Sequence, residues 1–178
     1  MRIIHQALWI LPALFAAGAG YTDYRWRRIP NWLTVPGLAL GIAVNSIARG
    51  WPGARESLLG AGLGLLILLP FVLVRSLGAG DWKLVGALGA FLGPRHLLTV
   101  LFATLFIAGL MALILVIWKR RLRQTFHNVG RMLAAMASLH LPGQEVSLDN
   151  PEALKVPFGI AVAIAVILYT VGHAWGVA

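Results

Sequence analysis

Apolar residues run in six long stretches along this chain, separated by polar or turn-rich segments. A membrane-spanning helix needs about 20 apolar residues, so this pattern predicts an all-α, polytopic membrane protein with a single domain over residues 1–178. The separators include the run Arg25–Asn31, the run Arg49–Gly53 and the sequence Gly93-Pro94-Arg95. The apolar stretches cover approximately residues 4–20, 32–48, 57–77, 82–93, 96–118 and 156–175.

The composition agrees with a membrane protein and excludes several other classes. The chain is 59% hydrophobic and 12% charged, whereas a soluble domain is about half apolar and a quarter charged. There is no cysteine, so disulfides and thiolate metal sites are excluded. The five histidines are scattered without metal-ligand spacing, so we expect no metal site. The net charge of +9 does not predict nucleic-acid binding, because the basic residues cluster between apolar stretches.

The distribution of lysine and arginine decides whether the short fourth stretch crosses the membrane. Its twelve residues rise only about 18 Å as a helix, less than the roughly 30 Å hydrocarbon core. With six spans, eleven basic residues share one side and four lie on the other, whereas five crossings give a split of six against nine. Because basic loops stay in the cytoplasm, we expect six transmembrane helices with both termini on the non-cytoplasmic side.

The N-terminal segment and the connection 119–155 each have a sequence pattern that indicates a structure. Arg2, the apolar run after it and the small residues 16–20 also resemble a cleavable signal peptide, which would leave an odd number of spans. The long connection 119–155 carries apolar residues at three- and four-residue steps, with basic residues on another face. We expect an amphipathic helix there, lying on the lipid of the inner leaflet.

Two of the six acidic residues lie beside or inside apolar stretches, where a carboxylate is costly to keep. Asp23 follows the first stretch and Asp81 precedes the fourth, so the six-span arrangement brings both to the cytoplasmic side. Gly78 and Gly80 remove side chains from the approach to Asp81, so that a substrate backbone or an opposing helix could come close. Lys83 follows two residues later and either orients the acid or a substrate carbonyl, or extends to the interface.

Two carboxyl groups a few ångströms apart share one proton, because both cannot ionise at that distance. Such a pair supplies a base that activates water and an acid that polarises a peptide carbonyl. The simpler alternatives are that Asp23 pairs with nearby arginines and that Asp81 is the N-cap of a helix after a glycine turn. The placement of both acids on one face favours a joint site.

Three motifs in this order resemble the signatures of the type IV prepilin peptidases. The run Asp23–Thr34 resembles the first signature, and Gly78–Leu84, with Ala87-Leu88-Gly89 behind it, resembles the second. Val156–Gly159 is similar to the start of their final span. The resemblance implies a membrane aspartic endopeptidase of the GxGD class, with Asp23 and Asp81 as catalytic acids.

The same resemblance implies what the protein acts on and where. The substrate would be a prepilin-like protein with a basic leader and an apolar N-terminal helix, cleaved at the cytoplasmic face of the inner membrane without a cofactor. Long members also methylate the new terminus and carry paired cysteines in an insertion, so this cysteine-free chain resembles the short, Flp-type members, and methylation is not expected. The alternatives are a proton-coupled transporter and a non-enzymatic pilus-assembly protein. The sequence predicts no oligomeric state.

Overall fold

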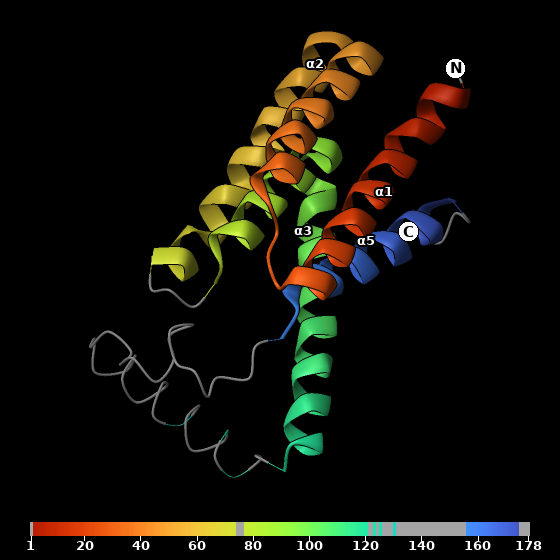
Figure 1. Cartoon of the computed structure of the whole chain (residues 1–178). Coiled ribbons are helices and arrows are strands. Elements are labelled where there is room, and N and C mark those ends of the chain that lie inside the picture. The colour runs from red at the N-terminus through yellow and green to blue at the C-terminus, as the bar shows by residue number, and fades with distance from the viewer. Residues whose placement is uncertain are drawn as a thin grey trace.

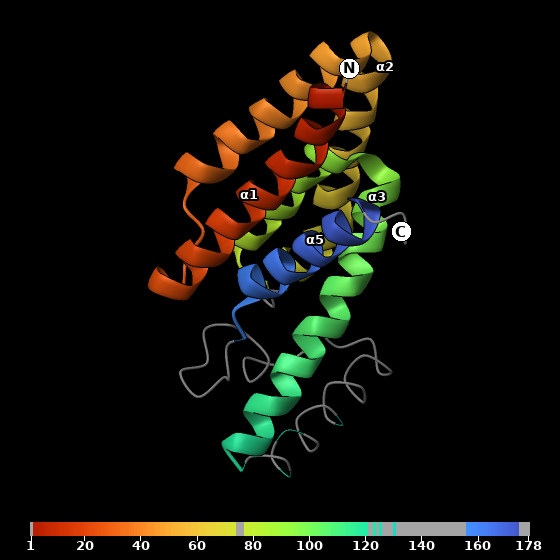
Figure 2. The same cartoon turned by 90° about the vertical axis from the view of Figure 1, so that its right-hand side faces the viewer.

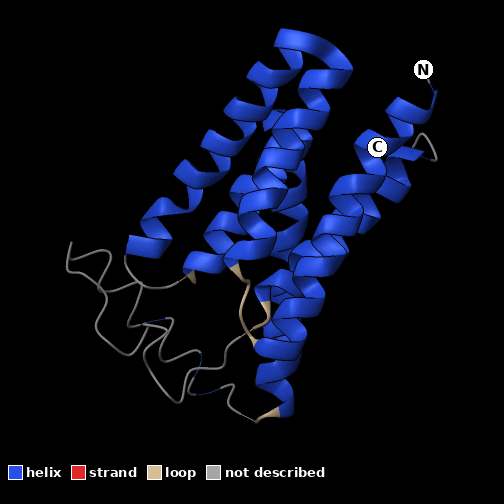
Figure 3. Cartoon of the chain, turned by 45° about the horizontal axis from the view of Figure 1, so that its top comes forward, coloured by secondary structure: helices blue, strands red, loops and turns tan. Residues whose placement is uncertain are grey.

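The computed structural model describes residues 2–73, 77–120, 123, 125, 130 and 156–174. Within these residues the protein is all-helical, with α1 (Arg2–Trp26), α2 (Asn31–Leu73), α3 (Ala79–Trp118) and α5 (Phe158–Ala174). Figure 3 shows these helices in blue, with a short loop between α1 and α2. The connection 119–155, with its expected amphipathic helix, lies almost wholly outside the described residues, so that prediction stays untested.

Two of the helices are interrupted at glycines that adopt a left-handed backbone. Gly50 has φ 64° and Gly93 has φ 73°, values that glycine tolerates because it has no Cβ. Gly50 reverses the direction of α2 into a helical hairpin, as Figure 1 shows. The predicted separators at 49–53 and 93–95 therefore coincide with real breaks, although helix continues on both sides with almost no loop.

Proline residues define the start of α2 and the break in α3. The carbonyl of Pro30 accepts hydrogen bonds from the N–H groups of Leu33, at 3.1 Å, and Thr34, at 3.3 Å, which begins α2. Pro94 has no N–H, so the carbonyl of Ala90 loses the donor that an uninterrupted helix would supply. Asn45 Nδ2 and Ser57 Oγ of α2 donate to that carbonyl instead, at 3.0 Å and 2.6 Å.

The helices form two closely packed pairs. α2 packs mainly on α3, and α1 packs mainly on α5, which also contacts α3. Figure 2 shows α1 and α5 side by side. They run antiparallel, because Trp9 near the start of α1 stacks on His173 near the end of α5, at 4.1 Å between ring centroids. At the same end, His96 Nδ1 and the Tyr169 hydroxyl are hydrogen-bonded at 2.6 Å.

Small residues fill the contacts between helices, while large apolar side chains cover the outside. In α2, Gly41, Gly60 and Gly64 are buried, and Ile47 is 83% exposed. Small residues at helix contacts are typical of membrane proteins, in which lipid solvates the large side chains. By length and hydropathy α2 and α3 are each able to cross a membrane, and α5 is a shorter apolar helix.

Candidate active site

Asp23 lies in the last turn of α1 and is held by the first turn of α5. Its carboxylate is buried, with the residue 7% exposed, and its Oδ2 accepts the N–H of Gly159 at 2.8 Å. The N–H of Ile160 is a second backbone donor to the same carboxylate. Arg27, just past the end of α1, acts on this carboxylate electrostatically.

Asp81 lies in the first turn of α3 and is half-buried. The N-cap of α3 is Gly78, so the alternative that Asp81 is itself the N-cap is wrong. The backbone of Gly78 instead hydrogen-bonds the Asp81 carboxylate, as the third residue of a helix does in a capping box. A Cβ on Gly78 would lie 3.0 Å from Asp81 Oδ2, so glycine leaves the room that this folded-back carboxylate occupies.

The structure brings the two carboxylates to the same end of the helix bundle. They are close enough for Asp23 to act electrostatically on Asp81. Gly80 contributes to this arrangement, because a Cβ there would lie 3.0 Å from the carbonyl oxygen of Ile29 in the loop between α1 and α2. The close approach that the glycines were expected to allow is therefore made by this loop.

Lys83 connects two of the motifs. Its Nζ donates a hydrogen bond to Oδ1 of Asn31 at 2.9 Å. Asn31 is the first residue of α2 and the last residue of the polar run Arg25–Asn31. The side chain thus ties the start of α3 to the start of α2, a role that neither of the two sequence-based alternatives described.

Gly159 is the contact that the sequence reasoning did not assign to the site. The sequence signal at this position is the motif Val156–Gly159, which by resemblance indicates only the start of the last span. No periodicity relates this motif to Asp23, because 136 residues separate the two hydrogen-bonded groups.

The sequence of the chain matches one protein family over the region that holds both carboxylates. The match is to the type IV leader peptidase family and covers residues 9–115. The chain belongs to this family. No solved structure matches it.

Two relatives of this family member carry the name prepilin leader peptidase/N-methyltransferase. One, from Xanthomonas campestris pv. campestris, is 29% identical over 132 residues, which cover 70% of this chain and 46% of the relative. The other, from Myxococcus xanthus, is 41% identical over 80 residues, which cover 41% of this chain and 24% of the relative. The chain thus spans less than half the length of either relative.

The site of this leader peptidase family member offers two acid–base groups. Among the described residues, no three His, Cys, Asp or Glu side chains gather as metal ligands. Two interacting carboxyl groups with backbone N–H donors are able to accept a proton from water and donate one to a carbonyl oxygen. Such acid–base groups suit the hydrolysis of an amide.

Proposed function

We propose that the chain is a membrane aspartic endopeptidase that removes the leader from prepilin-like precursors, with Asp23 and Asp81 as its catalytic pair. The observation that carries this proposal is the placement of both carboxylates at one end of the bundle, where Asp23 acts electrostatically on Asp81. Membership of the type IV leader peptidase family supports it. The proposal covers proteolysis without a cofactor and includes no methyl transfer.

The reaction follows from one proton shared by two acids. The ionised carboxylate takes a proton from water as the water oxygen bonds to the scissile carbonyl carbon, and the protonated partner gives its proton to the carbonyl oxygen. When the carbon–nitrogen bond breaks, the first acid passes its proton to the leaving amine. The second acid recovers a proton from the tetrahedral hydroxyl, which restores the starting state.

We also propose the membrane arrangement that this chemistry requires. The breaks at Gly50 and Gly93 would be the turns of a six-span bundle in the inner membrane, with both termini outside and the carboxylates at the cytoplasmic face. The chain has no cysteine, so single cysteines report cleanly. We expect an impermeant thiol reagent to label W51C from outside intact cells and R123C only after lysis. Labelling of both from the same side would contradict the arrangement.

The structure gives no support to the proton-coupled transporter. Transporter sites lie at broken helices near the middle of the membrane. Here the breaks are at Gly50 and Gly93, and the side chains beside the α3 break are Asn45 and Ser57. Asp81 lies in the first turn of α3, about 18 Å of helix away from Gly93.

Leader removal in the presence of site variants tests the function. We expect Asp23→Asn and Asp81→Asn each to reduce cleavage of a co-expressed prepilin by at least about 10³-fold, because asparagine neither takes nor gives the proton. Immunoblotting separates precursor from processed pilin and also measures the amount of inserted enzyme. Glu56→Gln is the matched control, since Glu56 pairs with Arg49 at 2.9 Å and both side chains are largely exposed.

Three results would contradict the proposal. Cleavage that persists in either aspartate variant would remove that residue from the mechanism. Equal loss in the Glu56→Gln control would show that the effect is not specific to the pair. A wild-type chain that leaves flagellin-like and Flp-type prepilins intact would contradict the peptidase function itself.

A further inference from the structure

The N-terminus of α5 is capped by a side chain from another helix. Pro157 accepts the first hydrogen bond of α5, from the N–H of Ala161 at 3.4 Å, and so occupies the N-cap position. A proline has no side-chain oxygen to accept from the free N–H groups of the first turn, which an N-cap residue normally satisfies. The carboxylate of Asp23, on α1, accepts from the N–H groups of Gly159 and Ile160 in its place.

This cap requires that residue 159 have no side chain. A Cβ built on Gly159 would lie 2.9 Å from Asp23 Cβ, 3.0 Å from its Oδ2 and 3.2 Å from its Cγ. All three atoms belong to a short side chain in a packed helix, so Asp23 could make room only by leaving the amides. Gly159 lies outside the matched family region, residues 9–115.

The two carboxylates therefore receive different support. Asp23 faces two backbone N–H groups at the positive end of a helix, and both features favour the charged form of a carboxylate. Asp81 receives the backbone of Gly78 from its own helix turn. The charged groups that face Asp23 are Arg27, just past the end of its own helix, and Asp81 on α3.

We infer that Gly159 is a positioning residue, through which the start of α5 holds Asp23 as the carboxylate that takes the proton from water. Asp81 is then the acid that gives its proton to the scissile carbonyl oxygen. This assignment rests on the proposed peptidase function and divides its two proton transfers between named residues. No other reactant is needed, because water and peptide supply every atom of the products.

Steady-state kinetics of Gly159→Ala test the inference, with purified full-length enzyme in detergent and a prepilin as substrate. We expect kcat to fall about 10²-fold, as misplacement of a reacting group by about 1 Å does, with KM within about twofold of wild type, because the added methyl group faces the Asp23 side chain. The acidic limb of the pH–rate profile should move to higher pH, because Asp23 loses donors that stabilise its charge.

Two matched glycine variants separate positioning from packing. Gly109→Ala adds a methyl group into open space and should leave kcat unchanged. Gly20→Ala places a Cβ 2.8 Å from Ala163 Cβ and 3.4 Å from the carbonyl oxygen of Gly159, so it crowds the same α1–α5 contact, but its three nearest atoms all belong to α5 and none to Asp23. We expect Gly20→Ala to lower thermal stability and to keep the wild-type pH profile. A pH profile displaced equally in Gly20→Ala would overturn the inference.

A second variant keeps the test decisive if Gly159→Ala does not fold. Ile160→Pro removes one N–H donor in the first turn of a helix, where proline is tolerated, and we expect kcat to fall about tenfold, as the loss of one hydrogen bond to a charged group predicts. Wild-type kcat and pH profile in this variant, or in folded Gly159→Ala, would refute the positioning role alone. A wild-type enzyme without cleavage would refute the proposed function first.

Discussion

Two groups of polar residues lie about 14–15 Å apart along α3, and they differ in how fully their hydrogen bonds are used. The break cluster consists of Asn45 and Ser57, which bond the carbonyls before Gly93. The carboxylate pair consists of Asp23 and Asp81 at the other end of this helix segment. Both groups are polar residues within apolar helices, so polarity alone does not separate them.

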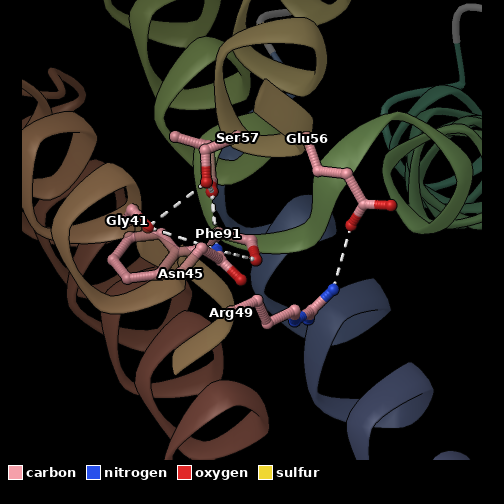
Figure 4. A network of polar contacts seen from close by, with 7 residues as sticks. Gly41, Asn45, Arg49, Glu56, Ser57 and Phe91 are labelled. Atoms are coloured by element: carbon pink, nitrogen blue, oxygen red, sulfur yellow. Dashed lines mark hydrogen bonds and ion pairs between the residues drawn. The ribbon is translucent and has the colours of Figure 1, made fainter. Parts of the chain in front are cut away.

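The side-chain donors of the break cluster are all used. Asn45 Nδ2 donates to the carbonyls of Gly41, Ala90 and Phe91 at 3.2, 3.0 and 3.0 Å. Ser57 is fully buried and donates to Ala90. Figure 4 shows both side chains turned toward backbone oxygens between α2 and α3. These donors replace hydrogen bonds that the break removes, so the cluster holds two helices together.

The carboxylate pair keeps capacity for a ligand. Each carboxylate offers about four lone-pair sites, and the backbone donors at the site number two for Asp23 and one for Asp81. A polar group whose donors all have acceptors stabilises a helix contact, whereas a carboxylate with spare acceptor sites is available for chemistry.

Asn45→Asp should have the largest effect on stability, because it puts a carboxylate where three carbonyl oxygens accept hydrogen bonds. We expect a loss of about 3–5 kcal/mol in the free energy of unfolding, as for an uncompensated buried charge. Thermal unfolding of purified protein in detergent, followed by circular dichroism, measures this. Asp81→Asn, the reverse exchange at the site, should melt close to wild type. Similar melting of wild type and Asn45→Asp would contradict the role of the cluster.

Gly89→Ala tests the backbone contact beside the break cluster. The added Cβ would overlap the carbonyl group of Gly60 on α2, so we expect a loss of about 1–3 kcal/mol in stability from overpacking. Cleavage per folded molecule should not change. Gly62→Ala is the control, since a Cβ there meets nothing within 4 Å. Equal melting temperatures for the two variants would show that the α2–α3 contact is looser than described.

Thr34→Val should have the smallest effect. The Thr34 hydroxyl is buried and finds no hydrogen-bond partner among the described residues. Valine has the same shape without the hydroxyl, so we expect a stability change within about 1 kcal/mol of wild type, in the stabilising direction. Thermal unfolding provides the measurement. A loss of more than about 2 kcal/mol in the free energy of unfolding would show that this hydroxyl is hydrogen-bonded, as the side chains of the break cluster are.

Much of this organisation was predictable from local sequence. Apolar runs and the Gly93-Pro94 pair located the helices and breaks, because both signals act within a few residues. The charge distribution indicated that Asp23 and Asp81 share one side, and the structure brings them together at one end of the bundle. The six-span topology and the amphipathic helix in 119–155 stay predictions.

The missed features all depend on which helix faces which. Nothing near Asn45 in the sequence indicates that its amide will meet carbonyls on α3, some 45 residues later. The sequence around Gly159 indicates only the start of a helix. Its contact with Asp23 is known only from the packing of α1 on α5. A uniformly apolar helix has no polar face to orient it, so one sequence does not reveal these pairings.

The hydrogen bond between Asp23 and Gly159 determines when the site can form during synthesis of the chain. Asp23 is synthesised early, whereas Gly159, whose N–H donates to its carboxylate, is synthesised 136 residues later. Until α5 has entered beside α1, a growing chain carries both acids with one of them unanchored. Under the proposed mechanism, insertion of α5 beside α1 would therefore complete the site of a newly made molecule.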